Sequence, residues 1–414
     1  MLKIVSTKQV RLGMFIHELK GSWIDHPFWK KAFKLEDSTD LKKLQASSIK
    51  EVVIDTSKGL DVLHEVEALP VEVKDHENLP PNQLQQAPVE TDSSVKPISK
   101  VKRITSSEER ARAKQVISAS KKAVTSMFND VRMGKAIRAE AAMQFVDDIA
   151  ESVARNEGAL ISLVRLKTKD DYTYMHSVAV CALMVALAKE LGMSEQHVKQ
   201  AGLAGLLHDI GKAAVPLDVL NKPGALTDDE FTLVKLHPER GHELLVQANI
   251  TDAVTLDVCL HHHEKVNGTG YPHRLQGDEI TLFARMGAVC DVYDAVTSNR
   301  PYKDGWEPGV SLQRMAQWAG HFDDVVFKAF VKSVGIYPIG SMVKLKSGRL
   351  AVVIDQSPKS LLTPIVKVFF STKSKTRLPV EVIDLSKGGA NDAIVGHEDP
   401  VFWGVHDVDK LWAE

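Results

Sequence analysis

The sequence has little that points to secretion or to a membrane. Its 414 residues contain three cysteines, none of them in a CxxC spacing, which argues against a disulfide framework and a cysteine-rich zinc site. No run of about 18 uncharged apolar residues is present, and the first 20 residues lack the apolar core of a signal peptide. We therefore expect a cytoplasmic protein with no membrane contact, whose cysteines stay reduced.

The chain also lacks a strong charge of either sign. Its formal net charge is −2, although 26% of the residues are charged. Such a balance gives no overall field that would attract nucleic acid or an anionic membrane. We expect no DNA or RNA partner, and any anionic ligand must be held by local groups.

Composition and periodicity divide the chain into four predicted segments, and the predicted fold class is mainly α. Residues 1–70 have the mixed pattern of a small α/β accessory module. Residues 71–104 are rich in Pro, Gln, Ser and charge, and they cannot bury enough apolar surface to fold alone, so we predict a flexible linker. Residues 105–335 are predicted to be a helical domain, and residues 336–414 a small β extension with a tail.

Capping signals and helical periodicity locate most of the predicted helices. Ser106 with Glu109 predicts one helix start, Thr227 with Glu230 predicts another, and Ser194 is a predicted cap of a third. The predicted helical segments are 106–134, 136–156, 170–192, 195–211, 228–236, 241–249, 251–264, 282–298, 309–320 and 323–335.

Histidines and aspartates recur on these helical segments, beside apolar neighbours. A single histidine of this kind is most often a satisfied core residue, but ligand-type residues on five successive segments favour a metal site. Neutral imidazoles together with carboxylates suit Fe, Mn, Zn or Ni. The residues are His176, His208, Asp209, His237, His261, His262, His263 and Asp291.

The adjacent pair His208 and Asp209 suits a site with two metal ions. A carboxylate that bridges two cations about 3.5 to 4 Å apart allows a water between them to become a hydroxide nucleophile near neutral pH. Hydrolysis of a phosphodiester needs such a nucleophile and neutralisation of the phosphate charge. Lys212, about one helical turn after Asp209, is expected to reach that phosphate. The alternative is a solvated lysine after a helix end.

Four ordered motifs resemble the signature set of the bacterial HD-GYP phosphodiesterases. They are HDIGK at 208–212, HPERG at 237–241, HHEKVNGTGYP at 262–272 and DVYDAVTSNRPYK at 291–303. The resemblance covers roughly residues 121–335 and implies an HD-type helical bundle as the catalytic domain. Asn267 departs from the family pattern, which usually has an aspartate there, and this bears on how the loop is anchored. The first domain and the linker resemble a poorly characterised N-terminal module that is often found on such enzymes.

The resemblance implies two divalent metal ions, with Fe or Mn favoured and Ni or Zn as alternatives. His261 is then the extra histidine of its run, and Asp294 is expected to orient Lys212 or a ligand. Some members hold a third cation with a glutamate one turn before the first histidine, but this chain has Tyr172 there, a poor ligand. The implied ligands are His176, His208, Asp209 and Asp291 for one metal, and Asp209, His237, His262 and His263 for the other.

Contacts to the substrate are implied in two further motifs. Gly270 and Tyr271 belong to the GYP loop, and Tyr271 is implied to touch the substrate. Arg300 and Lys303 match positions that the family uses for phosphate contact, and a solvated basic turn is the equal alternative for these two. Asp209 and Lys212 are the implied catalytic residues.

The implied activity is metal-dependent hydrolysis of cyclic di-GMP to linear pGpG, with continuation to GMP left open. Another cyclic dinucleotide, such as cyclic GMP-AMP, is an alternative because the contacts that read the bases cannot be located. A catalytically idle module that binds the nucleotide and signals is a rival of another class, and the complete ligand set argues against it. Whether the chain works as a homodimer or with a signalling-protein partner stays open.

Overall fold

The computed structural model divides the chain into two compact units, residues 1–99 and 100–414. Among the described residues, no helix has both the length and the apolar character of a membrane span. The described residues are 2–20, 33–35, 41, 44–45, 51–60, 104–135, 137, 139–165, 172–222, 224, 226–298, 305–357, 360–387 and 392–413.

The first unit contains a four-stranded antiparallel sheet with the order β1-β4-β2-β3. Alternate apolar residues of these strands, among them Val5, Ile16 and Ile54, are buried in a small core of their own. The strands are β1 (Leu2–Ser6), β2 (Phe15–Lys20), β3 (Phe33–Lys34) and β4 (Glu51–Asp55).

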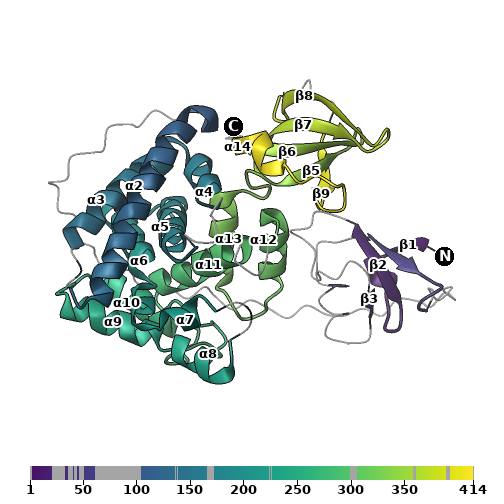
Figure 1. Ribbon diagram of the computed structural model, residues 1–414. Coiled ribbons are helices and arrows are strands. Elements are labelled where there is room, and N and C mark those ends of the chain that lie inside the picture. Colours follow the sequence, from purple (N-terminus) through teal and green to yellow (C-terminus); the bar gives the residue numbers. More distant parts are fainter. Residues whose placement is uncertain are drawn as a thin grey trace, which may run out of the picture. The chain divides into compact units, whose positions relative to one another are not determined.

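The second unit is mainly helical, which confirms the predicted fold class (Figure 1). Its helices are α2 (Ser106–Arg132), α3 (Ala139–Arg155), α4 (Glu157–Arg165), α5 (Tyr172–Glu190), α6 (Glu195–Leu207), α7 (Leu217–Leu220), α8 (Asp228–Val234), α9 (His237–Gln247), α10 (Ala253–His261), α11 (Leu282–Thr297), α12 (Pro308–Ala316) and α13 (Asp324–Val334), with short 3-10 turns at Ile210–Ala214 and Gly277–Glu279.

Helix α5 is the central element of this bundle. Its residues from Met175 to Ala188 are all buried, as expected of a helix that is apolar on every side. It packs against α2, α3, α4, α6, α11 and α13. Gly205 allows α6 to approach closely, because a Cβ atom there would lie 2.9 Å from the carbonyl oxygen of Val180. This contact brings the C-terminal end of α6 beside His176.

The start of α2 differs from the prediction by one residue. The capping box is formed by Thr105 and Glu108, not by Ser106 and Glu109. Both pairs fit the sequence pattern, but Ser106 donates its hydroxyl to Asp355 at 2.7 Å and Glu109 is fully buried. Ser106 and Glu109 therefore make tertiary contacts, and Thr105 and Glu108 remain available for the cap.

Two other cap predictions are confirmed, and one helix was missed. Ser194 caps α6, and Thr227 forms a capping box with Glu230 at α8. The sequence predicted no helix for residues 157–165, where α4 lies. Asn156 ends α3 and accepts a hydrogen bond from the backbone of the first turn of α4, so one apolar stretch becomes two helices.

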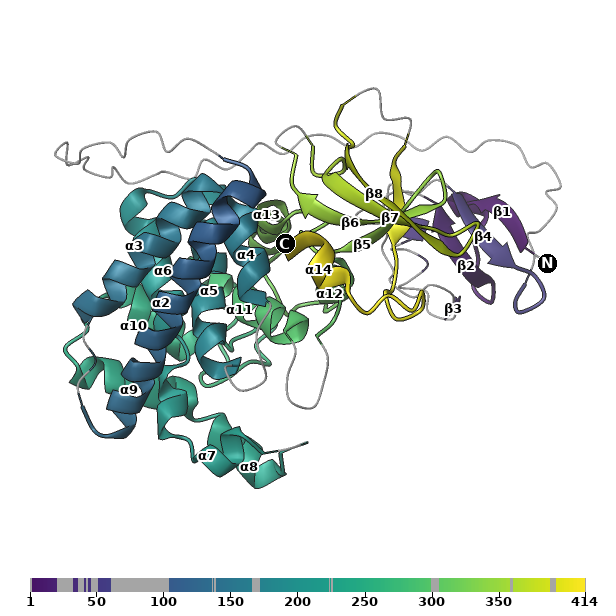
Figure 2. The ribbon, with the colours of Figure 1, turned by 45° about the horizontal axis from the view of Figure 1, so that its top comes forward.

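The predicted C-terminal β extension is confirmed as a five-stranded antiparallel sheet with the order β8-β7-β6-β5-β9. A short helix, α14 (Val408–Ala413), lies beside β6 (Figure 2). The strands are β5 (Met342–Leu345), β6 (Arg349–Asp355), β7 (Ile365–Ser371), β8 (Thr376–Asp384) and β9 (Ile394–His397).

Candidate metal centre

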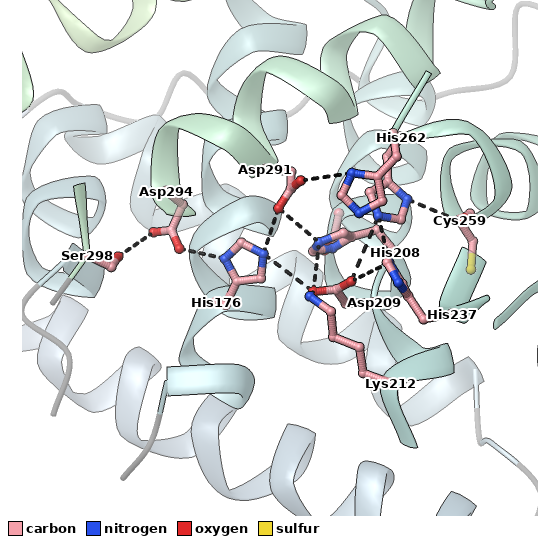
Figure 3. A network of polar contacts seen from close by, with 12 residues as sticks. His176, His208, Asp209, Lys212, His237, Cys259, His262, Asp291, Asp294 and Ser298 are labelled. Atoms are coloured by element: carbon pink, nitrogen blue, oxygen red, sulfur yellow. Dashed lines mark hydrogen bonds and ion pairs between the residues drawn. The ribbon is translucent and has the colours of Figure 1, made fainter. Parts of the chain in front are cut away.

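Five helices bring the predicted ligands to one place (Figure 3). Most of these side chains are almost completely buried, and His263 is the most open of them, with 23% of its side chain exposed. His176 comes from α5, His208 and Asp209 follow α6, His237 begins α9, His262 and His263 follow α10, and Asp291 comes from α11.

The Asp209 carboxylate lies between two pairs of imidazoles. Its Oδ2 atom is 3.4 Å from Nε2 of His176 and 3.4 Å from Nε2 of His208. Its Oδ1 atom is 3.1 Å from Nε2 of His237 and 3.8 Å from Nε2 of His262. Each oxygen thus faces a different pair of nitrogens, which is the arrangement that a bridging carboxylate requires.

Asp291 completes the first group. Its Oδ1 atom is 2.9 Å from Nε2 of His176 and 3.9 Å from Nε2 of His208, and its Oδ2 atom is 3.7 Å from Nδ1 of His263. His176, His208 and Asp291 form one set of three ligand atoms within 4.8 Å of one another. The second set is His237, His262 and His263.

Backbone carbonyl groups determine which nitrogen of three histidines faces the cluster. A carbonyl oxygen only accepts a hydrogen bond, so the Nδ1 atom that contacts it carries the hydrogen and Nε2 keeps its lone pair. These contacts join Nδ1 of His208 to Gly205 at 2.8 Å, Nδ1 of His237 to Val234 at 2.7 Å, and Nδ1 of His262 to Val258 at 3.0 Å.

Asp294 holds the fourth imidazole, that of His176. Its Oδ2 atom lies 2.6 Å from Nδ1 of His176, and its Oδ1 atom accepts a hydrogen bond from Ser298 at 3.3 Å. Burial lowers the pKa of His176, but the hydrogen bonds to Asp291 and Asp294 outweigh burial, so this pKa is raised. Asp294 is therefore placed to orient a candidate ligand, one of the two roles that the sequence suggested.

The chemistry of the cluster fits metal cations. Nε2 of His208 and Oδ1 of Asp209 are buried and accept no hydrogen bond in the described part of the chain. Nε2 of His237 lies 3.3 Å from Nε2 of His262, a close approach of two lone pairs. Buried acceptors that converge without a donor would be satisfied by a cation.

The protonation states of Asp209, His262 and His263 also suit metal ligands. Burial raises the pKa of the Asp209 carboxyl, but Lys212 and His208 lower it more, so the pKa lies well below its usual value. Burial lowers the pKa of His262 well below its usual value and that of His263 to about 3. An ionised carboxylate and neutral imidazoles are the forms that bind metals.

Lys212 lies at the edge of the cluster. Its Nζ atom is 2.5 Å from Oδ2 of Asp209, and 22% of its side chain is exposed. The short 3-10 turn Ile210–Ala214, which follows His208 and Asp209 directly, places it there. The ammonium group is thus anchored on the Asp209 carboxylate and is still accessible from outside.

The GYP loop folds back over the second set of histidines. The Tyr271 ring stacks on His263, with ring centroids 4.7 Å apart and an interplanar angle of 24°. A Cβ atom at Gly270 would lie 2.5 Å from the Cα atom of Glu264, so only glycine fits at this close approach. The tyrosine is placed beside a candidate ligand by this packing.

Glu264 anchors the loop, a role that the sequence analysis missed. Its side chain is 2% exposed, and its Oε1 atom accepts hydrogen bonds from the backbone of His273 at 2.6 Å and of Arg274 at 2.9 Å. Arg274 has a φ of 57°, an uncommon conformation that these bonds support. The available signal was an acid directly after two predicted ligands.

Asn267 supports the same loop although it is not an aspartate. Its side-chain oxygen accepts hydrogen bonds from the backbone and the hydroxyl of Thr269, at 3.1 and 2.7 Å. Its backbone N–H donates to the carbonyl of Gly320 at 2.9 Å. An amide oxygen performs this local capping as a carboxylate oxygen does, so the departure from the family pattern leaves the loop anchored.

His261 belongs to neither set of candidate ligands. Its Nδ1 atom lies 2.7 Å from Oδ1 of Asp257, and its Nε2 atom lies 2.9 Å from Nδ1 of His273. Three predicted residues lie outside what the structure describes. These are Arg300, Lys303 and, for its side chain, Tyr172.

Comparison with known families gives two matches that together span most of the chain. A model described as "HD domain" matches residues 150–326, which contain all the candidate ligands. A model described as "Domain of unknown function (DUF3391)" matches residues 2–142.

One relative matches over the whole length. A protein of Pseudomonas aeruginosa, named a cyclic di-GMP phosphodiesterase, is 52% identical over 413 residues, which cover 100% of this chain and 96% of the relative. A cyclic di-GMP phosphodiesterase response regulator of Xanthomonas campestris is 44% identical over 139 residues, 33% of this chain and 37% of that protein. A 3′3′-cGAMP-specific phosphodiesterase of Vibrio cholerae is 35% identical over 167 residues, 40% of this chain and 38% of that protein.

Proposed function

The chain belongs to the HD-GYP family of cyclic-dinucleotide phosphodiesterases, and from this premise we propose that it hydrolyses cyclic di-GMP to linear pGpG at the cluster around Asp209. The observation that carries the proposal is the position of this carboxylate, whose two oxygens face two separate pairs of imidazoles. The full-length relative named a cyclic di-GMP phosphodiesterase supports the choice of substrate.

We propose two divalent cations per chain, Fe or Mn ahead of Ni or Zn. When bound, they would supply activated water and offset the negative charge of the phosphate. The unsatisfied buried acceptors of the cluster support this assignment. The proposed ligands are His176, His208, Asp209 and Asp291 for one cation, and Asp209, His237, His262 and His263 for the other.

The protein side chains then have distinct proposed roles. Asp209 keeps the two halves of the cluster together, and Lys212 extends from it to contact the scissile phosphate. Tyr271 and its neighbour Gly270 form the wall against which the substrate lies. Arg300 and Lys303 remain proposed phosphate contacts on the strength of their motif.

The proposed domain plan keeps residues 1–70 as an accessory module, 71–104 as a tether, 105–335 as the catalytic domain and 336–414 as a C-terminal extension. The boundary between the compact units, at residues 99 and 100, supports a division within the tether. We place the enzyme in the cytoplasm, where its three free, buried cysteines would stay reduced.

The decisive experiment is a substrate comparison with metal-loaded protein. Protein purified without oxygen and loaded with Mn or Fe should hydrolyse cyclic di-GMP with a higher kcat/KM than 3′3′-cyclic GMP-AMP, and chromatography should show pGpG as the first product. Preference for cyclic GMP-AMP would favour the specificity of the Vibrio cholerae relative. Tight binding of the nucleotide without turnover would instead identify an idle signalling module.

A further inference from the structure

A cation and two aromatic rings meet where α8 ends, next to the GYP loop. The Nζ atom of Lys235 lies 4.7 Å from the ring centroid of Phe231 and 5.6 Å from the ring centroid of Tyr271. No motif of the sequence points to Phe231 or Lys235. The three side chains together are called the α8 ledge below.

The ledge is connected to the metal centre in two ways. Tyr271 stacks on the candidate ligand His263. Lys235 is two residues before the candidate ligand His237, whose Nδ1 donates to the carbonyl of Val234 at 2.7 Å. The backbone turn that orients His237 therefore also positions Lys235, so the ledge lies at a defined place beside the cluster.

The outer part of the ledge is open and available to a ligand. The Phe231 side chain is 49% exposed, and Lys235 is exposed as well. Within the described residues, no carboxylate forms an ion pair with Lys235. Lys212, by contrast, is held by Asp209. A cation that rests on aromatic rings and has no acidic partner keeps its charge available for a phosphate.

We propose that Phe231 and Lys235 bind the half of the cyclic dinucleotide that is not being cut, an inference that rests on the proposed function. The substrate carries two phosphates and two purines. The proposed metal ligands and Lys212 account for one phosphate, and Arg300 and Lys303 are phosphate contacts by motif alone, without an assignment to either phosphate. Lys235 contacts the second phosphate, and the exposed face of Phe231 stacks on a purine.

A purely structural role for the same contacts gives different expectations. Lys235 could serve only to attach α8 to the GYP loop, and its removal would then loosen the loop for every substrate. The proposed contact role concerns only substrates that extend beyond one phosphate. A small diester such as bis(p-nitrophenyl) phosphate, which has a single phosphate, separates the two roles.

The experiment compares steady-state kinetics of Mn-loaded Lys235→Met, Lys235→Arg and Phe231→Leu with those of the unchanged protein. For cyclic di-GMP, Lys235→Met should raise KM roughly tenfold through loss of a charged hydrogen bond, with kcat and Mn content preserved. Lys235→Arg should restore most of the affinity. Phe231→Leu should raise KM by roughly fivefold or more through loss of stacking, and Phe231→Tyr should not.

Matched controls come from other exposed positions of the same unit. Lys328 on α13 and Phe402, which is 77% exposed, lie on other elements, so Lys328→Met and Phe402→Leu should leave KM unchanged. Hydrolysis of bis(p-nitrophenyl) phosphate by Lys235→Met should equal that of the unchanged protein. An equal loss with both substrates, or an unchanged KM for cyclic di-GMP, would overturn the proposal.

A direct measurement of nucleotide binding distinguishes an error in the proposal about the ledge from an error in the proposed function. If the unchanged protein hydrolyses no cyclic di-GMP, the proposed function is wrong, and calorimetric titration of the Mn-loaded protein with this nucleotide then tests the ledge. Weaker binding by Lys235→Met than by Lys328→Met supports it. Equal binding by the two variants, or no binding by the unchanged protein, refutes it.

Discussion

The cluster of proposed metal ligands and the α8 ledge lie side by side, and they differ in burial and in the contacts that hold their side chains. In the cluster, all rings except that of His263 are buried, and each of these four imidazoles is held through its Nδ1 atom by a carbonyl or a carboxylate. In the ledge, Phe231 and Lys235 are exposed, and the side-chain contacts that join the ledge are those between the Lys235 cation and the rings of Phe231 and Tyr271. A buried site with oriented ligands suits metal binding, and an open one suits a substrate that must enter and leave.

The largest expected effect is in the centre of the cluster. Asp209→Ala should abolish hydrolysis and lower the metal content, because two cations would then repel each other without a shared anion. Metal analysis and an activity assay on protein purified without oxygen measure both effects. Asp148→Ala, at an exposed position on α3, is the control and should change neither. Full metal content in Asp209→Ala would show that Asp209 does not bridge.

The second prediction tests whether the hydrogen bonds that orient the imidazoles contribute to metal affinity. Asp294→Asn retains the shape of the side chain but weakens the hydrogen bond to Nδ1 of His176, so metal affinity should fall roughly 10- to 100-fold. Competition with a chelator measures this affinity. Ser298→Ala, which removes the 3.3 Å bond to the far oxygen of Asp294 and leaves the carboxylate in place, should have a much smaller effect. Equal effects of the two changes would count against an orienting role.

This contrast also explains how much the sequence could predict. The proposed ligands are recognisable because all of them except His176 belong to a local motif, and most of the helices between them follow from periodicity. The orienting partners of His208, His237 and His262 are main-chain carbonyl groups, which no side-chain pattern records. Lys235 approaches Tyr271 across 36 positions of the chain, and only the fold shows that they meet.

Errors at the helix ends have a similar cause. The pattern for a capping box fits Ser106 with Glu109 as well as Thr105 with Glu108, and a buried contact to Asp355 decides between them. Both pairs satisfy the local pattern, so the tertiary partner determines the outcome. The same holds for α4, where the side chain of Asn156 starts a new helix.

The third prediction concerns substrate affinity without loss of metal. The double change Arg300→Ala with Lys303→Ala should raise KM for cyclic di-GMP, at a cost of about 1.5 to 3 kcal/mol for each charged hydrogen bond lost. Metal stoichiometry should stay intact, as measured by elemental analysis. Metal loss in the double variant would place these residues among the supports of the cluster.

The smallest effect is expected at His261, which adjoins two proposed ligands in sequence and contacts neither set. Its ring lies between Asp257 and His273, so it connects α10 to the arm of the loop that follows Tyr271. His261→Ala should leave the metal content unchanged and raise KM about two- to fivefold, since one net hydrogen bond contributes about 1 kcal/mol. His406→Ala, at an exposed position near the C-terminus, should change nothing.

His263→Ala, two residues further along the same histidine run, should remove a proposed ligand and lower the metal content. If His261→Ala loses metal while His263→Ala keeps it, the assignment of ligands within the triple histidine is wrong, and His261 and His262 are the ligands instead of His262 and His263.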